Sequence, residues 1–278
     1  NPASFVADQI TLNGGTIQAS LGNIVFNSNR GLTLGEQGGT FDSAGNTIVI
    51  TNATVGSGSL RKTGVGSLVL SNALAYTGNT AVNQGTLRWG SNRSLPNTTN
   101  ITLAGGATCD VSVAGVTLAS AQSFQASGSG ATGMVLTAAS KGVTLGATSS
   151  LRFTAYNGQA APLAIAGAGS IVLSAGNPVT VTIANGGTPL AAGSYTLIAK
   201  GASGSVAGAV PTSLTIGGDG IAGDTVGALA ITAGELILQV IQLEPPAVTT
   251  VAASATNTTA ATLNGEVTAD GGAAVTER

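Results

Sequence analysis

The feature that most constrains the fold is a short unit, Gly-Thr followed by an apolar residue, that returns along the chain. It begins at Gly15, Gly39 and Gly85, and a weaker form begins at Gly106. The spacings of 24, 46 and 21 residues indicate a period of about 20 to 24 residues if the longest spans two periods. A unit of this length holds three short strands and three turns, which is one coil of a parallel β-helix.

The residues between the turns favour strands over helices. Short segments rich in Val, Ile, Leu and Thr alternate with clusters of Gly, Asn and Ser, and no apolar stripe of helical period is sustained. Stacked coils would bury their aliphatic rows in one core and pair each strand with its equivalent about 4.8 Å away. The clearest predicted strands are 23–26, 47–51, 67–70, 170–173, 179–183 and 235–240.

The alternative fold, an antiparallel sandwich, requires Asn-Gly or Asp-Gly hairpin turns at short intervals. The first Asn-Gly turns between strand-like segments are Asn157-Gly158 and Asn185-Gly186. A departure from the regular solenoid is therefore expected, if anywhere, within residues 150–243.

The amino-acid composition argues against nucleic-acid binding and membrane insertion. Only 7% of residues are charged and the net charge is −2, so nucleic-acid binding is not expected; the longest basic cluster is Arg61-Lys62. Membrane insertion is not expected either, because the most apolar stretches, 163–173 and 236–243, are shorter than a span of about 20 residues and are interrupted by polar residues or Gly. With 43% hydrophobic residues, the chain has enough apolar surface to fold.

Residues 58–87 closely resemble the autotransporter-associated β-strand repeat of bacterial passenger domains. The resemblance implies a right-handed β-helix, an extracellular or cell-surface location and no catalytic residues within the repeat. The translocating C-terminal domain of that family lies outside these 278 residues, so the sequence does not predict self-export. The stretch from 189 to 240 also resembles the segment that closes such solenoids. The matching positions are Gly58, Leu60, Lys62, Gly64, Gly66, Leu68, Leu70, Tyr76, Gly78, Thr80, Val82, Gly85 and Leu87.

A boundary is predicted at the Pro-rich linker, 244–246, which separates the β-helix of residues 1–243 from a tail of residues 247–278. The tail resembles the first two strands of a fibronectin-type-III or immunoglobulin-like module, at 247–251 and 261–267. Such a module needs about seven strands and about 100 residues. A two-strand tail can complete its ladders by joining a neighbouring sheet. The residues predicted to form these assembly strands are Val248, Val251, Leu263 and Val267.

Two functions follow, both non-enzymatic and both extracellular. In the first, copies of the chain join head to tail through the tail and form a cell-surface filament or layer. In the second, the chain is a fragment of a long bacterial adhesin or autotransporter stalk, with other surface proteins or glycans as partners. The ends, Asn1-Pro2 and Arg278, are expected to reflect a removed leader, a cleavage site or a piece of a longer protein.

The residue inventory does not predict an active site or a cofactor. The chain has no His, which excludes Ser–His and Cys–His catalysis, and its eleven acidic residues are scattered. The minor candidates for a calcium site are Asp219 and Asp224, because hard cations require several oxygen ligands. Turn chemistry explains the surrounding Gly-Asp-Gly without a metal.

Three further features receive structural interpretations. The single Cys109 is predicted to be a buried apolar residue. Trp89 is predicted to cap the core, with an exposed sugar-stacking platform as the alternative. The Asn-x-Ser/Thr triplets are predicted to be turn and ladder residues rather than glycosylation sites. These triplets begin at Asn52, Asn92, Asn97, Asn100 and Asn257.

Overall fold

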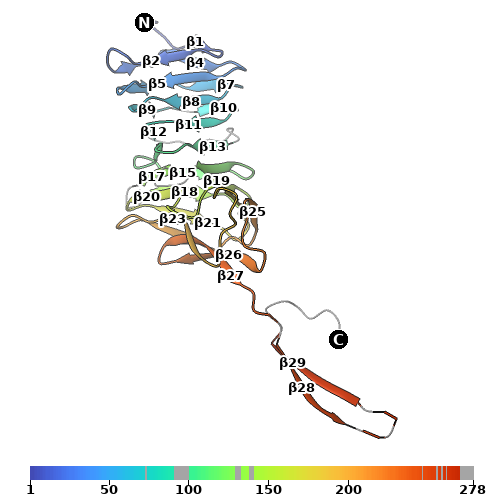
Figure 1. Ribbon diagram of the computed structural model, residues 1–278. Coiled ribbons are helices and arrows are strands. Elements are labelled where there is room, and N and C mark those ends of the chain that lie inside the picture. Colours follow the sequence, from blue (N-terminus) through green and yellow to red (C-terminus); the bar gives the residue numbers. More distant parts are fainter. Residues whose placement is uncertain are drawn as a thin grey trace.

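A computed structural model describes residues 1–72, 74–90, 100–128, 133–137, 141–245, 247–254, 256–257, 259–260 and 262–269. The described residues are all-β and form a stack of coils, with the N-terminus at one end and a detached C-terminal hairpin beyond the other (Figure 1). Parallel pairing of successive coils makes the stack a β-solenoid. The predicted fold class is therefore confirmed.

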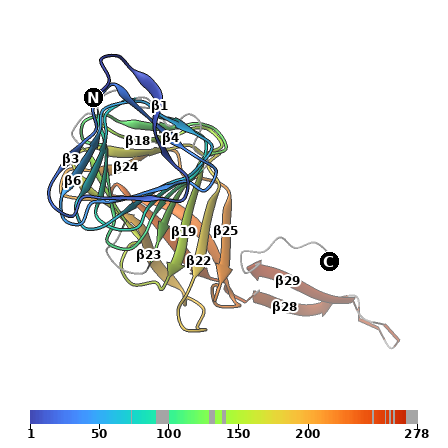
Figure 2. The ribbon, with the colours of Figure 1, turned by 90° about the horizontal axis from the view of Figure 1, so that it is seen from above.

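One wall of the solenoid consists of two short parallel sheets. Seen along the stack, strands of both sheets lie on the same side (Figure 2). The first sheet contains β1 (Val6–Leu12), β4 (Arg30–Leu34), β7 (Thr54–Gly56) and β10 (Leu74–Tyr76). The second contains β15 (Val116–Leu118), β18 (Gly142–Leu145), β21 (Ser170–Leu173) and β24 (Ser205–Gly208).

The second wall is a nine-stranded parallel sheet that runs the length of the stack. Its strands, in spatial order, are β2 (Thr16–Gln18), β5 (Gly39–Asp42), β8 (Leu60–Thr63), β11 (Thr80–Val82), β13 (Asn100–Leu103), β16 (Ser123–Ser127), β19 (Ser150–Tyr156), β22 (Val179–Ile183) and β25 (Leu214–Gly218).

The third wall is a ten-stranded sheet that is parallel except at its C-terminal end. From the N-terminal end its strands are β3 (Ile24–Val25), β6 (Thr47–Ile50), β9 (Ser67–Leu70), β12 (Thr86–Trp89), β14 (Thr108–Asp110), β17 (Gly133–Thr137), β20 (Leu163–Gly167), β23 (Gly193–Ala199), β27 (Glu235–Gln242) and β26 (Thr225–Thr232).

Inward-facing aliphatic residues of the three walls form one continuous core, because side chains alternate along each strand and coils stack in register. Ile48, Leu68 and Leu87 are consecutive partners in one such row, and all three have no exposed surface. The core has no compact centre. Each coil is instead buried by the coils before and after it.

Coil length varies along the stack. Register partners are 24 residues apart from Thr16 to Thr40, near the N-terminal end, and 35 residues apart from Thr180 to Thr215. The predicted period of 20 to 24 residues therefore describes the first half of the chain. Parallel pairing nevertheless continues to Gly218, so the longer coils accommodate the Asn-Gly turns without leaving the solenoid.

One part of the repeat assignment was wrong. Gly15 and Gly39 lead into strands of the nine-stranded sheet, whereas Gly85 leads into β12 of the ten-stranded sheet. The spacing of 46 residues between Gly39 and Gly85 therefore does not represent two coils. Similar Gly-Thr-apolar units therefore precede strands of two different walls, because both walls begin after turns with the same chemistry. The weaker unit that begins at Gly106 does lie one coil after the unit at Gly85, because Thr108 is the register partner of Thr86.

The two ends of the solenoid differ. At the N-terminal end, β1, β2 and β3 are the outermost strands of their three sheets. At the C-terminal end, β27 pairs antiparallel with β23 and with β26, and its residues Leu236, Leu238 and Val240 are buried. This antiparallel unit closes the core.

Beyond the cap, β28 (Ala247–Ser254) and β29 (Thr262–Ala269) pair only with each other among the described residues, as an antiparallel hairpin (Figure 1). All residues of β28 are exposed. No helix in the described part of the chain is long and apolar enough to cross a membrane.

Candidate functional site

The repeat segment, 58–87, spans one coil of the N-terminal half and continues into the next, because it runs from β8 through β11, the following strand of the same sheet, to β12. Its non-glycine motif residues all point into the core and are at most 1% exposed. These residues are Leu60, Lys62, Leu68, Leu70, Tyr76, Thr80, Val82 and Leu87. The motif therefore specifies side chains that fill the core of the solenoid.

The motif glycines lie where the backbones of neighbouring coils approach most closely. A Cβ atom at Gly58 would lie 1.8 Å from the carbonyl oxygen of Gly35, and one at Gly66 would lie 1.8 Å from that of Asn46. At Gly78 a Cβ would lie 2.4 Å from the backbone of Gly58. No larger residue fits such contacts without moving a coil.

Gly64 and Gly85 have an additional constraint. Both adopt positive φ, +73° and +69°, at the same corner of consecutive coils. L-residues rarely adopt this conformation, so glycine is required by backbone geometry as well as by space.

A completely buried lysine occupies this corner. The Nζ atom of Lys62 donates to Ser43 Oγ at 2.8 Å, to the carbonyl oxygens of Thr63 and Gly64 at 2.6 Å each, and to that of Gln84 at 3.1 Å. These acceptors belong to the preceding coil, the same coil and the following coil. A single ammonium group therefore joins three successive turns.

Burial has an electrostatic cost at this position. Desolvation lowers the pKa of Lys62 from 10.5 to about 8, and the nearby carboxylate of Asp42 opposes the shift. Among the described residues, the acceptors in hydrogen-bond contact with Nζ are backbone carbonyl groups and the Ser43 hydroxyl rather than a carboxylate, so these groups solvate the charge. These hydrogen bonds of Lys62 stabilise the stacked turns of three successive coils. The ammonium group is buried and is not presented to solvent as a reactive group.

A second buried polar contact fixes the opposite corner of the same coil. The hydroxyl groups of Tyr76 and Thr80 are 2.6 Å apart. Burial raises the pKa of Tyr76 to about 12, and the hydrogen bond with Thr80 opposes this shift. Tyr76 therefore links β10 to β11 within the core and is not an exposed ligand-stacking residue.

The remaining sequence features are also structural. Trp89 has no exposed surface, so it belongs to the core and cannot form the alternative sugar platform. Cys109 is buried, and burial raises the pKa of its thiol, with the charge of Asp110 adding to the shift. Its thiolate is disfavoured, which makes it a poor nucleophile.

The two calcium candidates have separate protein partners. The carboxylate of Asp219 accepts backbone N–H groups of Asn185 and Gly187, at 2.6 and 3.0 Å. The carboxylate of Asp224 accepts a hydrogen bond of 2.7 Å from Gln242. Within the described ranges, no group of three or more His, Cys, Asp or Glu side chains converges as a metal site.

The Asn-x-Ser/Thr triplets have mixed positions. Asn52 is buried, Asn100 donates to Asn79 in the neighbouring coil, and Asn257 accepts backbone N–H groups in the turn of the hairpin. Asn92 and Asn97 lie outside the described residues.

The predicted assembly strands form the hairpin itself. Val248 and Val251 are 60% and 55% exposed, and Val248 is the register partner of Val267. Leu263 lies within β29. The prediction that these strands pair with an adjacent copy is not tested by a single chain and stays a prediction.

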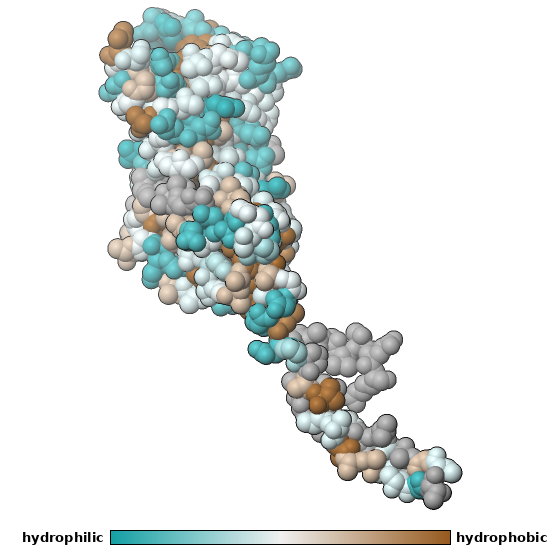
Figure 3. All heavy atoms as spheres, viewed as in Figure 1, coloured by the Kyte–Doolittle hydropathy of each residue, from teal (hydrophilic) through white to brown (hydrophobic). Residues whose placement is uncertain are grey.

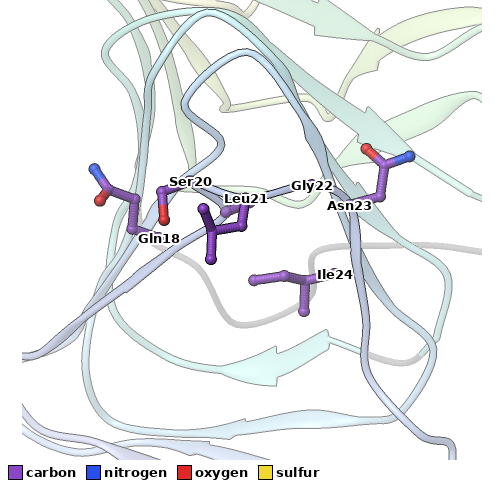
Figure 4. Close-up of a pocket in the computed structure, with 7 residues that line it drawn as sticks. Gln18, Ser20, Leu21, Gly22, Asn23 and Ile24 are labelled. Carbon is purple, nitrogen blue, oxygen red and sulfur yellow. The ribbon is translucent and has the colours of Figure 1, made fainter.

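Sequence reasoning missed buried polar positions that lack a hydrogen-bond partner and a hollow beside the first coil. The side chains of Asn52 and Thr54 are buried without a hydrogen-bond partner in the described part of the chain. The turn between β2 and β3 lines a hollow of about 290 Å³ at the N-terminal end (Figure 4). The alternation of inward and outward residues along the strands could have indicated the buried polar positions. No local sequence pattern indicates the hollow.

This geometry defines a class of protein: a parallel β-solenoid whose described surface has no converging reactive groups. The comparisons agree with it. Residues 60–88 match the family model described as passenger-associated-transport-repeat. The chain therefore contains an autotransporter passenger repeat, as the sequence predicted.

Among known proteins, the chain is similar to the adhesin BmaC autotransporter of Brucella suis biovar 1 (strain 1330). The two are 42% identical over 93 residues, which cover 32% of this chain. The same alignment covers 3% of that relative, so this chain corresponds to a small part of its length. No solved structure gives a significant match.

Proposed function

We propose that the chain is a non-enzymatic segment of the extracellular stalk of a bacterial surface adhesin. The observation that carries this proposal is the passenger repeat set in an uninterrupted solenoid, in which every motif side chain serves the interior. The similarity to an autotransporter adhesin supports the same function. A stalk needs length and resistance to unfolding rather than a reactive site, and stacked coils provide both.

The charge content supports this proposal. Only one ion pair, Arg88 with Asp110 at 3.2 Å, connects side chains in the described part of the chain. Core packing and interstrand hydrogen bonds therefore provide the stability of the rod. Neither depends strongly on extracellular salt.

The head-to-tail filament predicted from the sequence has no support from the comparisons, which favour the stalk. It was motivated by the two-strand tail, which the structure shows as an exposed hairpin, and by the unpaired strand edges expected at the end of a solenoid. It stays a prediction.

Surface labelling tests the stalk function. Antibodies raised against residues 1–243 should label intact cells of the source organism, and protease added outside the cells should remove the label. Labelling only after permeabilisation would contradict the proposal. Purified chain should also fail to cleave polysaccharides, because most glycoside hydrolases need a pair of carboxyl groups and the eleven acidic residues of this chain are scattered along the sequence.

A further inference from the structure

A second hollow, of about 460 Å³, lies on the outer face of the first wall, over β18, β21 and β24. Pockets that bind small organic groups have volumes of about 300 to 1,000 Å³, so this hollow is large enough for one such group. Four polar side chains line it, those of Lys141, Thr144, Ser170 and Ser205, and its other lining residues are glycine or alanine.

Small residues in an outward-facing row create this hollow. Gly142, Ser170 and Ser205 are consecutive register partners on the three strands. The residue that follows each of them is buried, so these three positions face outward. At Gly142 a Cβ atom would lie 1.9 Å from the carbonyl oxygen of Ser170, so no larger residue fits there unless the strands move.

The hydroxyl groups in the hollow are available to a ligand. The side chains of Thr144, Ser170 and Ser205 form no hydrogen bond with another described residue. The backbone N–H groups of the two serines are already used, because they donate to the carbonyl oxygens of Lys141 and Gly169 in the preceding coils. Each free hydroxyl can both donate and accept a hydrogen bond, which suits a ligand that itself carries hydroxyl groups.

Two lysines lie at the corner where the third wall leads into this sheet. Lys141 immediately precedes β18, and Lys200 immediately follows β23 in the turn that leads to β24. A Cβ atom at Gly234 would lie 3.4 Å from Cδ of Lys200 and 3.2 Å from Cβ of Ser205, so the Lys200 side chain lies beside the hollow. Since β18 and β24 are two coils apart, the lysines flank the hollow at a spacing of about 10 Å along the stack.

Acidic side chains are scarce around these lysines. Residues 111–218 include Lys141, Arg152 and Lys200 but contain no Asp or Glu. One carboxylate, that of Glu235, reaches this corner, where its Oε1 accepts the backbone N–H of Lys200 at 3.2 Å. Within the described ranges, neither lysine forms an ion pair. The hollow therefore combines uncompensated positive charge with free hydroxyl groups, and such a surface attracts anions.

We propose that this hollow binds an acidic saccharide unit, whose carboxylate or sulfate group contacts Lys141 and Lys200. The sugar hydroxyls bond to the serine and threonine hydroxyls that line the hollow. Lysine ammonium groups bind both kinds of anion as point charges. On the face seen in Figure 3, most of the solenoid surface is hydrophilic or intermediate, which suits a hydroxylated partner better than an apolar one. The inference concerns binding by the purified chain and does not depend on the proposed stalk function.

Isothermal titration calorimetry on residues 1–278 tests the proposal with three probes. Hyaluronan oligosaccharides carry carboxylates, dextran sulfate carries sulfates, and dextran carries neither group. At least one acidic probe should bind, with an affinity that falls as the salt concentration rises, whereas dextran should not bind. The acidic probe that binds identifies the anionic group. Failure of both acidic probes to bind, or equal binding of dextran, would overturn the proposal.

Charge variants locate the site. Lys141→Gln and Lys200→Gln should each raise the dissociation constant by about threefold to tenfold, because each removes one charge-assisted contact. Arg152→Gln is the matched control, since Arg152 is exposed on β19 of the nine-stranded sheet, and its loss removes the same charge from a different wall. Its dissociation constant should equal that of the wild type. An equal loss of affinity in all three variants would contradict the proposal, because overall charge alone would then attract the polymer.

A variant that fills the hollow without changing any charge gives an independent check. Ser170→Leu should raise the dissociation constant by roughly tenfold or more, because the larger side chain occupies the space of the saccharide. Thr180→Leu is its control, since Thr180 faces outward between buried residues of β22 on another wall. Both variants should keep the circular-dichroism spectrum of the wild type. Undiminished binding by folded Ser170→Leu would show that the hollow is not the binding site.

Discussion

In the repeat coil Leu60, Leu68 and Leu87 have no exposed surface, whereas every residue of β28 in the C-terminal hairpin is exposed. Both regions consist of short strands rich in Val, Leu, Thr and Ala. In both regions the strands pair with a neighbouring strand. The coil, however, has a neighbour above and below, while the hairpin has no second layer among the described residues.

The comparison separates strand propensity from stability. A two-stranded hairpin is marginally stable in water, because its side chains gain little burial in return for the entropy lost on ordering. The same residue types become a rigid core when coils stack, since each inward row then contacts two others. Burial between coils, rather than the strand pattern, makes the solenoid stable.

Truncation of a core leucine gives the largest expected difference between the two regions. Leu68→Ala should lower the free energy of unfolding by about 2 to 5 kcal/mol, because the cavity lies between Ile48 and Leu87. Val251→Ala in the hairpin should change it by less than about 0.5 kcal/mol. Denaturant unfolding measures both. Equal losses in the two variants would show that the hairpin packs on a partner in solution.

A glycine pair tests how closely the coils approach. Gly66→Ala should cost about 1 to 3 kcal/mol, because its Cβ would lie 1.8 Å from the carbonyl oxygen of Asn46. Gly223→Ala is the control, because no atom lies within 4 Å of the added methyl group. Thermal unfolding should show a lower midpoint for the first variant only. Similar midpoints would mean that neighbouring coils can separate without loss of stability.

The change expected over a single pH unit is smaller, and it comes from the contribution of the buried lysine to the pH dependence of stability. The pKa of Lys62 is about 8 in the folded chain and 10.5 when exposed, so between these values the unfolded chain binds more protons. The contribution of Lys62 to the free energy of unfolding should therefore rise with pH across this interval, by at most about 1.4 kcal/mol per unit, whereas Cys109, whose thiol pKa is raised by burial, contributes in the opposite sense. Below pH 8 both states are protonated and the contribution is constant.

Lys62→Met should remove this slope, whereas Arg61→Met, on the exposed face of the same strand, should retain it. Urea unfolding at a series of pH values measures the difference between each variant and the wild type, so that titration of other groups cancels. If Lys62→Met keeps the wild-type dependence of stability on pH, then the ammonium group of Lys62 in the wild type is solvated as well in the coil as in water.

Much of the repeat coil could be predicted from the sequence. The alternation of Leu60, Lys62, Leu68 and Leu70 with polar residues assigns each to the inward side, because side chains alternate strictly along a strand. The turns were equally readable, since Gly64 and Gly85 occupy positions that require positive φ. Strand boundaries such as 67–70 and 179–183 follow from the same local rules.

The sequence could not show which turns stack. Gly39 and Gly85 begin similar units yet lead into different walls, and only the register, with Thr40 beside Arg61 and Thr86 beside Ser67, separates them. The same local pattern therefore occurs before strands of two different walls. The length of each coil, and hence the pairing, depends on turns that adjust to their neighbours.

The sequence by itself therefore determined the strands, the inward rows and the passenger-type repeat. The tertiary structure decided how the charge of Lys62 is accommodated, because its acceptors, from Ser43 to Gln84, come from three different coils. It also decided that the antiparallel unit of β23, β27 and β26 follows the last parallel coil. Such properties depend on which segments meet across the stack, whereas alternation and turn chemistry act between residues that are adjacent in the chain.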